Sequence, residues 1–227
     1  MEHFFETRDE ASIAAAEQIA SALQRRLDLK RVASLVVSGG TTPSRCFQEL
    51  AQTDLNWSGI NVLASDDRWV PPDHEDSNEK LIRETLLVER AAEADFLPFY
   101  SPDNSIEERC TDLDSDIRLA PFPFACALLG MGADGHFASL FPDASNLATG
   151  LDIDSQSLCM PVKTDASPYA RVSLTLSALS RSDEIVLLFF GDDKREIYEA
   201  AKLDSNGYPV SRLLRQKRAP VHTYWAP

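Results

Sequence analysis

The first regular pattern of hydrophobic and polar positions has the period of an α-helix. Apolar residues recur three or four positions apart at Ile13, Ala16, Ala20, Leu23 and Leu27. Just before this pattern, Thr7 is followed three residues later by Glu10, the spacing of an N-terminal capping box. The pattern therefore predicts a helix over residues 8–27.

Short apolar runs, several of them rich in β-branched residues, recur along the rest of the chain and predict strands. These runs cover residues 32–37, 60–65, 95–100 (expected at a sheet edge), 124–129, 171–176, 184–190 and 221–225. Helical stretches separate them, at 43 onward, at about 79–87, at 104–118 and at 191–202. The second helix is expected to be capped by Thr42, with Pro43 at its first position.

Strands that alternate with helices are typical of a mostly parallel sheet covered by helices on both faces. The expected fold is therefore α/β and modified Rossmann-like. The sequence contains no repeat, low-complexity tract or Gly/Ser linker, so we expect a single domain over residues 1–227. Residues 143–168 have the least regular pattern and are interpreted as an excursion over the functional site.

Three polar, glycine- or charge-rich loops directly follow predicted strands, at 38–42, 66–77 and 130–142. Ligands of open α/β sheets bind at the carboxyl ends of the strands. We therefore expect these three loops to line one crevice.

The first loop, in the segment SGGTTP (38–43), has the composition of a phosphate-binding turn. Gly39 and Gly40 allow close approach of a ligand to backbone N–H groups, and Thr41 and Thr42 add hydroxyl donors at a helix start. The segment lacks the GK[ST] of a Walker A loop. An ordinary tight turn between strand and helix is the alternative.

The second loop, SDDRWVPPDHEDSN (65–78), places Asp66, Asp67 and Arg68 directly after a strand. The Arg68 guanidinium could clamp a phosphate, or it could pair with a carboxylate. The acidic run DHED (73–76) could suggest a metal site. Neighbouring loop residues seldom share one ion with good geometry, so we interpret this run, His74 included, as a solvated loop.

The third loop contains Gly130-x-Gly132-x-x-Gly135, which is the spacing of a dinucleotide-binding fingerprint. That fingerprint normally lies in the first strand–helix unit and opens a long helix, whereas here Pro142 follows soon after. We therefore favour a tight loop that exposes Asp134 and His136 for acid–base chemistry. The alternative is a histidine that is hydrogen-bonded by the backbone.

Two further basic residues lie at the start of a predicted strand and of a predicted helix. Arg171 begins a predicted strand, and Lys194 lies in the first turn of the last long helix, where a cation is unfavourable unless an anion binds beside it. Both could also be ordinary surface charges. His3 and His222 lie near the chain ends and are interpreted as structural or solvated.

Charge and composition narrow the classes of function. The chain has 227 residues, 44% of them hydrophobic, and a formal net charge of −14. This charge argues against nucleic-acid binding but allows a local cluster of cations to bind a small anion. We find no pattern of a signal peptide and no apolar run of about 18 residues, so we expect a cytoplasmic protein without a membrane partner.

The cysteines support the same interpretation. Cys46, Cys110, Cys126 and Cys159 form no CxxC pair, so a zinc ribbon or a dithiol redox site is not expected. Reduced, packed thiols are typical of the cytoplasm.

Taken in order, the segments SGGTTP, SDDRWVPPDHEDSN, LLGMGADGHFASLFP, ARVSLTL and GDDK resemble those of the 6-phosphogluconolactonases. These are hydrolases of the oxidative pentose phosphate pathway. The resemblance runs from about residue 5 to the C-terminus, and GMGADGHxASLFP is its most specific part. The glucosamine-6-phosphate deaminases are similar too: they share the sugar-phosphate isomerase-like fold and carry a GxGxDGH loop.

The differences favour the lactonases. The deaminases resemble this chain at Asp66 but continue toward a Glu-Tyr pair, whereas Asp67 and Arg68 follow here. They also carry a catalytic Glu in a segment such as AFNEP after the His, where this chain has ASLFP. A lactone hydrolase needs fewer proton-transfer groups than a ring-opening isomerase. Asp67 is one departure, because lactonases more often have Glu at that position.

The resemblance implies a role for each matching residue. His136 would be the catalytic base, Asp134 would orient it or support the site, and Arg68 would act at the phosphate or at the oxyanion. Residues implied in binding of substrate or phosphate are Gly39, Gly40, Thr41, Thr42, Asp66, Arg68, Gly132, Arg171 and Lys194.

The resemblance also implies a phosphosugar lactone, 6-phospho-D-glucono-1,5-lactone, as substrate, with no metal and no organic cofactor. The chain is expected to be a monomer or a homodimer. An enzyme of the deaminase type and a non-enzymatic sugar-phosphate sensor are the alternatives; the chain has no room for the DNA-reading domain that such a sensor needs.

Overall fold

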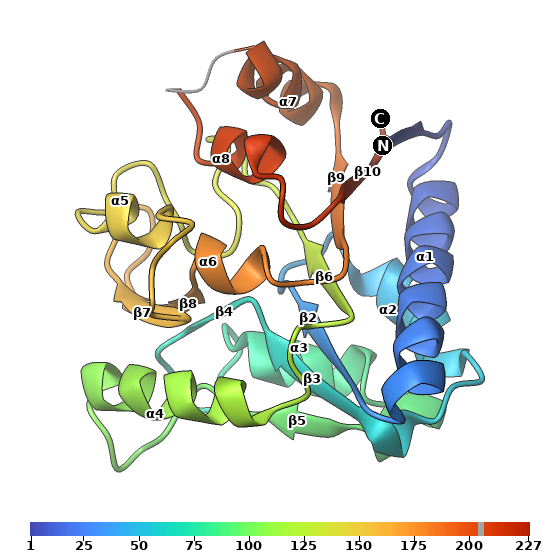
Figure 1. Ribbon diagram of the computed structural model, residues 1–227. Helices are drawn as coiled ribbons and strands as arrows, with labels where there is room; N and C mark the ends of the chain where they lie inside the picture. The colour runs from blue at the N-terminus through green and yellow to red at the C-terminus, as the bar shows by residue number, and fades with distance from the viewer. Residues whose placement is uncertain (204–206) are drawn as a thin grey trace.

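The computed structural model describes residues 1–203 and 207–227 (Figure 1). Its helices are α1 (Arg8–Lys30), α2 (Ser44–Gln52), α3 (Asn78–Thr85), α4 (Ile106–Leu119), α5 (Leu147–Gly150), α6 (Leu176–Leu179), α7 (Asp192–Leu203) and α8 (Val210–Arg215), with 3₁₀ turns η1 (Trp57–Gly59) and η2 (Glu89–Glu93). Its strands are β1 (Glu2–Phe4), β2 (Ala33–Val37), β3 (Ile60–Ala64), β4 (Asp66–Arg68), β5 (Asp95–Leu97), β6 (Cys126–Leu129), β7 (Cys159–Val162), β8 (Arg171–Leu174), β9 (Ile185–Phe190) and β10 (Val221–Ala226).

Seven strands form a parallel sheet in the order β1-β10-β9-β6-β2-β3-β5. From β2 the chain first proceeds to β3 and β5 on one side, and then crosses to β6, β9 and β10 on the other. The strand order therefore reverses between β2 and β6. In a parallel sheet such a reversal opens a crevice at the carboxyl ends of the two strands, since the connections leave them in opposite directions.

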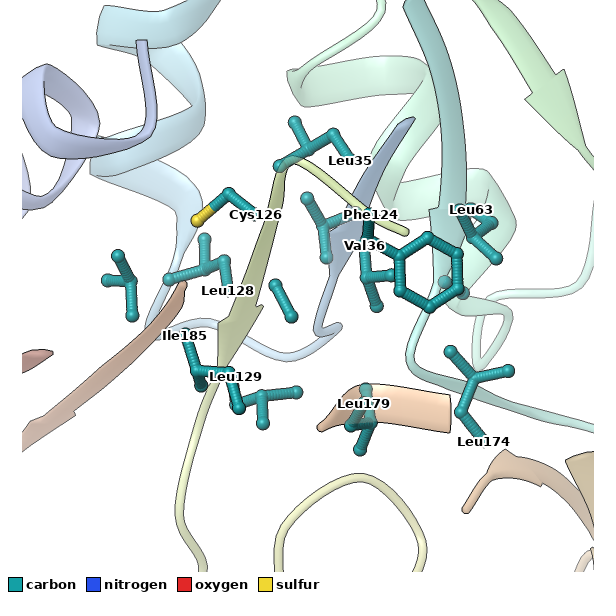
Figure 2. Packing of buried hydrophobic residues seen from close by; sticks show 14 of the residues in the cluster. Leu35, Val36, Leu63, Phe124, Cys126, Leu128, Leu129, Leu174, Leu179 and Ile185 are labelled. Carbon is teal, nitrogen blue, oxygen red and sulfur yellow. The ribbon is translucent and has the colours of Figure 1, made fainter. Parts of the chain in front are cut away.

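The central strands are buried on both faces, as their continuous apolar runs predict. Leu35, Val36 and Val37 of β2 and all four residues of β6 have no exposed surface. Figure 2 shows Leu35 and Val36 beside Leu128 and Leu129, with Leu179 of α6 on the same core. Each side chain of this size contributes about 1.5–3 kcal/mol when it is fully buried. A rigid core thus fixes the positions of the loops that follow β2 and β6.

Helices cover both faces of the parallel sheet, as predicted. α1 and α2 pack against each other on one side, where α1 contacts β2, β6, β9 and β10. On the other side, in Figure 1, lie α6 and a small antiparallel sheet of β4, β8 and β7. None of the helices in residues 1–203 and 207–227 combines the length and apolar character that a membrane span needs.

Several local predictions are confirmed. Helix α1 begins with the Thr7–Glu10 capping box, in which the Thr7 hydroxyl accepts from the Glu10 N–H and the Glu10 carboxylate accepts from the Thr7 N–H. The segment 95–100 contains β5, which forms one edge of the parallel sheet. All four cysteines are free and buried.

Other predictions were wrong. Helix α2 begins at Ser44, and no side chain of the described residues caps it, so Thr42 is not its cap. Asp66, Asp67 and Arg68 form strand β4 rather than a loop, because they pair in antiparallel register with β8. The strand predicted at 171–176 ends at Leu174 and belongs to this small sheet. By contrast, residues 143–168 contain the four-residue elements α5 and β7 and are otherwise turns and coil, as their irregular pattern predicts.

Candidate active site

A cavity of about 590 Å³ lies at the reversal of strand order and brings the predicted site residues together. The loops after β2 and β6, strand β4, the start of β8 and the first turn of α7 all contribute to its wall. All eleven predicted residues line it: Gly39, Gly40, Thr41, Thr42, Asp66, Arg68, Gly132, Asp134, His136, Arg171 and Lys194. The structure therefore brings the predicted residues together in one cavity.

The loop after β6 folds into a tight turn that presents His136 to this cavity. The N–H of Gly132 donates to the carbonyl of His136 at 2.9 Å, and the N–H of Gly135 donates to the carbonyl of Gly132 at 3.0 Å. Gly135 has a φ of +76°, a conformation that L side chains rarely adopt. The next helix, α5, begins only at Leu147 and spans four residues. The glycines thus shape a turn and do not open the long helix of a dinucleotide site.

His136 is oriented by a carboxylate and by an aromatic ring. Its Nδ1 lies 2.5 Å from Asp134 Oδ1, and its backbone N–H donates to the same oxygen at 3.2 Å. The imidazole centroid lies 4.1 Å from that of Phe141. The partner of the ring is therefore Asp134 and not the backbone, contrary to the alternative interpretation. With Nδ1 engaged, Nε2 is the ring nitrogen left for a ligand, and the side chain is 27% exposed.

Arg68 is held by oxygens that carry no formal charge. Its Nη1 donates to the carbonyl of Asp76 at 2.9 Å and to Asn78 Oδ1 at 2.8 Å. The amide of Asn78 is fixed in turn, because its Nδ2 donates to the carbonyl of Asp66 at 2.8 Å. Among the described residues Arg68 forms no ion pair, so its positive charge is not neutralised by a neighbouring carboxylate.

The carboxylate of the neighbouring Asp67 organises the segment 66–78. Its carboxylate accepts from the N–H groups of Arg68, Asn78 and Glu79 at 2.7–2.9 Å and from the Ser77 hydroxyl at 3.3 Å. Burial raises the pKa of Asp67 to about 6, against the opposing effect of these hydrogen bonds. Asp67 thus anchors the start of α3, where Asn78 lies, to strand β4.

Asp66 and Ser139 position Arg171. The buried Asp66 carboxylate accepts from the Ser65 hydroxyl at 2.8 Å and from the Ser139 hydroxyl at 2.5 Å. Arg171 Nη1 lies 3.6 Å from Asp66 Oδ2 and 3.3 Å from Ser139 Oγ. Burial lowers the pKa of the Arg171 guanidinium below its ordinary value, while Asp66 opposes that shift. Its Cζ lies 5.1 Å from the centroid of Phe141, so Phe141 contacts both His136 and Arg171.

Part of the cavity lining is suited to an anion. Thr41 and Thr42 line it just before α2, a nine-residue helix without a side-chain cap, so the partial positive charge of its N-terminus is not offset by a capping oxygen. Lys194, in the first turn of α7, adds a full positive charge to the same wall. These features favour the binding of a phosphate group.

The described residues contain no group of three or more His, Cys, Asp or Glu side chains that could hold a metal ion. In the acidic run at 73–76, His74 Nδ1 accepts from the N–H of Asp76 at 3.1 Å, and its ring packs on that of Tyr169. The run therefore forms a loop with local hydrogen bonds.

Three residues of the site were not foreseen. Asn78 contacts Arg68, Ser139 contacts Asp66, and Phe141 contacts His136 and Arg171. Asn78 stands at the start of a helix, and Ser139 and Phe141 follow His136 within a few residues. Proximity to the predicted base was the signal that could have found the last two.

Comparison with known proteins agrees with this geometry. A family model described as glucosamine-6-phosphate isomerases/6-phosphogluconolactonase matches residues 6–225. A 6-phosphogluconolactonase of Mesorhizobium japonicum is 35% identical over 98% of this chain and 94% of its own length. The counterpart from Caulobacter vibrioides is 37% identical over 98% of this chain and 95% of its own length.

Solved structures show the same likeness. The crystal structure of a 6-phosphogluconolactonase from Shewanella baltica superposes with a TM-score of 0.95 at 34% identity, covering 100% of this chain and 97% of that one. With its matching sequence, its parallel sheet with a strand-order reversal, and its His136–Asp134 pair in a cationic cavity, the protein belongs to the glucosamine-6-phosphate isomerase/6-phosphogluconolactonase family.

Proposed function

We propose that this protein hydrolyses 6-phospho-D-glucono-1,5-lactone to 6-phospho-D-gluconate, the second step of the oxidative pentose phosphate pathway. The observation that carries this proposal is the placement of a carboxylate-oriented histidine in a cavity that also presents a phosphate-suited loop. Full-length relatives that bear the name 6-phosphogluconolactonase support it.

In the proposed mechanism the phosphate of the substrate docks against residues 39–42, with Arg171 and Lys194. Binding of this remote group orients the lactone and lowers the entropic cost of reaction. Asp66 and Ser139 hold Arg171 in place through the contacts described above.

His136 then acts as the base through Nε2. It takes a proton from a water molecule as the water oxygen attacks C1 of the lactone, and the C1 carbonyl becomes a tetrahedral oxyanion. Arg68, whose charge is not neutralised by an ion pair, stabilises this oxyanion together with backbone N–H groups of the glycine-rich loop. When the bond between C1 and the ring oxygen breaks, the proton on Nε2 passes to that oxygen.

Asp134 stabilises the imidazolium that exists between these two proton transfers. Its Oδ1 accepts from Nδ1, which fixes the tautomer in which Nε2 is free to accept the proton. No metal or organic cofactor enters this scheme, since the lactone carbonyl is already electrophilic.

The cavity favours a lactonase over a deaminase of the same family. Asp66 and Asp134 are the carboxylates among the described residues that line it, and both are engaged by protein donors or by His136. The segment after His136, Phe137–Phe141, contributes no further acid. A ring-opening deamination would require an additional proton-transfer group.

We place this activity in the cytoplasm, with the free, buried cysteines as support. The direct test is hydrolysis of freshly prepared 6-phosphogluconolactone, followed as acid release or through coupled 6-phosphogluconate dehydrogenase, with an enzyme-free blank for spontaneous opening. Acceleration over the blank is the expected result. A rate equal to the blank, with release of ammonia from glucosamine 6-phosphate, would instead assign the deaminase reaction.

A further inference from the structure

A second cavity, of about 540 Å³, lies beside Thr41 and Thr42, in the loop between β2 and α2 that we call the phosphate loop (residues 39–42). Thr41, Thr42 and Lys194 line both this cavity and the active site, so the loop is a wall between them. The second cavity lies between the N-terminal turns of α1, α2 and α7. It is therefore next to the proposed substrate site and shares Thr41, Thr42 and Lys194 with it.

The charge of this second cavity is opposite to that of the protein as a whole. Arg8, Arg45 and Lys194 line it, with Asp9 as the opposing carboxylate, in a chain whose net charge is −14. Arg8 donates through Nε to the carbonyl of Pro227 at 2.9 Å, which leaves its two terminal nitrogens for other acceptors. Arg45 forms an ion pair with Glu49 at 2.6 Å through Nη2 alone. Such convergent cations raise the local concentration of anions.

Two features indicate a binding site rather than a patch of charge. The hydroxyl of Ser12 is buried, and no described residue hydrogen-bonds to it, although Ser12 lines this cavity. A buried polar atom without a partner is rare in folded proteins and points to an unseen ligand or water. Ser44, the first residue of helix α2, which has no side-chain cap among the described residues, also lines this cavity. By contrast, α1 is capped by Thr7, and α7 carries Asp192 and Asp193 in its first turn.

From this arrangement we propose that the second cavity binds a phosphate-type dianion, either inorganic phosphate or a phosphomonoester. Arg8 and Arg45 would supply the charge, and Ser12 and Ser44 would supply hydroxyl donors. Because Lys194 faces both cavities, an anion in the second cavity competes for it with the phosphate of the substrate. Occupation of the second cavity therefore weakens binding in the first; this part of the inference rests on the proposed function.

Calorimetric titration with inorganic phosphate tests the proposal without reference to catalysis. The titration is made at low ionic strength, in the presence and absence of saturating 6-phosphogluconate, which fills the active site as the reaction product. We expect one equivalent of phosphate still to bind when 6-phosphogluconate is present, with its affinity reduced about fivefold or more. Thermodynamic reciprocity requires that phosphate lower the affinity for 6-phosphogluconate by the same factor.

Three variants identify the site. Arg45→Gln and the double variant Arg8→Gln/Arg45→Gln should weaken this phosphate binding tenfold or more, and Ser12→Ala should weaken it less. All three should bind 6-phosphogluconate as the wild type does. Lys30→Gln, at the far end of α1, removes the same charge at an exposed position and should change neither affinity.

Two results would overturn the proposal. Loss of all phosphate binding at saturating 6-phosphogluconate would show a single, shared site. An equal loss of affinity for both ligands in Arg45→Gln would make the second cavity a part of the substrate site. If 6-phosphogluconate does not bind the wild type at all, the proposed function fails, while the phosphate titrations of wild type and Arg45→Gln still decide whether the second cavity binds the anion.

Discussion

Nδ1 of His136 and Oδ1 of Asp134 are 2.5 Å apart, in a turn where one residue separates them. The same oxygen also accepts from the backbone N–H of His136. A single carboxylate oxygen therefore fixes both the imidazole and the peptide unit that carries it. This relationship leaves Nε2 as the ring nitrogen available to a substrate, and it explains why a short loop suffices to position the imidazole.

Replacement of His136 by alanine is expected to lower kcat for lactone hydrolysis by about 10²–10⁴, because general base catalysis contributes a factor of that size. Asp134→Asn should lower kcat by a smaller factor, since the base remains but its tautomer is no longer fixed. Stopped-flow or coupled assays, corrected for spontaneous opening, give both numbers. Asp73→Asn, an exposed carboxylate of another loop, serves as the control. A His136→Ala variant with near-normal kcat would exclude this histidine as the base.

Because Gly132 has no side chain, it leaves room for the imidazole of His136 and the carboxylate of Asp134. A Cβ at position 132 would lie 2.2 Å from Cε1 and Nδ1 of His136 and 2.7 Å from Asp134 Oδ1. Gly132→Ala must therefore displace the imidazole, and a displacement of about 1 Å can cost about 10² in rate. We expect kcat to fall and KM to change little.

Gly130→Ala is the matched control for that variant in the same loop. A Cβ at position 130 meets nothing closer than Ser38 Oγ at 3.8 Å, an ordinary contact distance. Its kcat should stay within a few-fold of the wild type. Equal losses in the two variants would mean that loop flexibility, and not the position of His136, determines the rate.

The sequence was sufficient to place the residues of the site in one cavity. Loops after parallel strands meet at one edge of a sheet, so Gly39, Arg68 and His136 could be brought together without knowledge of the strand order. The buried strands β2 and β6 were equally visible, because a parallel sheet requires continuous apolar runs.

The contacts that orient these residues could not be predicted from the sequence in the same way. The bond between Ser139 and Asp66 spans 73 residues and depends on how the small antiparallel sheet is placed. Strand β1 has three residues and no pattern of its own; it forms because Glu2 to Phe4 align with Thr223 to Trp225 of β10. Tertiary context determines such short segments, and local propensity does not.

Asn78 is predicted to position Arg68. Asn78→Ala removes one of the two acceptors of Arg68 Nη1, so kcat should fall while KM for the phosphorylated lactone changes less, if Arg68 acts at the oxyanion. Gly39→Ala should have a similar effect by another route, because its Cβ would lie 2.0 Å from Asn78 Oδ1. Kinetic constants of the two single variants and of the double variant provide the measurement.

In the double variant Gly39→Ala/Asn78→Ala the collision is removed together with the amide. We expect it to be no slower than Asn78→Ala alone, whereas independent effects would multiply. Gly40→Ala, where a Cβ meets no atom within 4 Å but φ is +84°, should cost stability without this coupling. Strict additivity of Gly39→Ala and Asn78→Ala would contradict the proposed link between the phosphate loop and Arg68.

Arg171 is expected to bind the phosphate. Arg171→Ala removes the guanidinium and its charge-assisted hydrogen bonds to the phosphate, which contribute about 1.5–3 kcal/mol. KM should therefore rise about 10- to 100-fold while kcat changes little. Arg171→Lys should recover part of this, since it keeps the charge but not the two-pronged geometry. Arg181→Ala, whose guanidinium lies over Phe122 and not on the cavity, is the control. A fall in kcat at unchanged KM would instead place Arg171 at the lactone.

His222 makes the stability of the fold depend on pH. It is buried in β10, and burial lowers its pKa below the ordinary value of 6.5, although Glu184, 3.9 Å away, opposes the shift. Because the folded state favours the neutral imidazole, this contribution to stability is complete above pH 6.5. It is lost as the pH falls from 6.5 through the lower pKa of the folded protein. His3, Arg25 and the N-terminal amine act in the same direction as burial.

Urea unfolding between pH 5 and 8 measures this dependence. On acidification below pH 6.5 the free energy of unfolding of the wild type should fall relative to that of His222→Gln, which cannot take up the proton. Asp67, whose pKa burial raises to about 6, stabilises the fold as the pH falls over part of the same range, but this effect is common to both proteins and cancels in the comparison. His74→Gln, in the segment 66–78, is the matched histidine-to-glutamine control. If His222→Gln and the wild type lose stability in parallel over this range, protonation of His222 is not the cause, and the other groups that titrate on acidification must account for the loss.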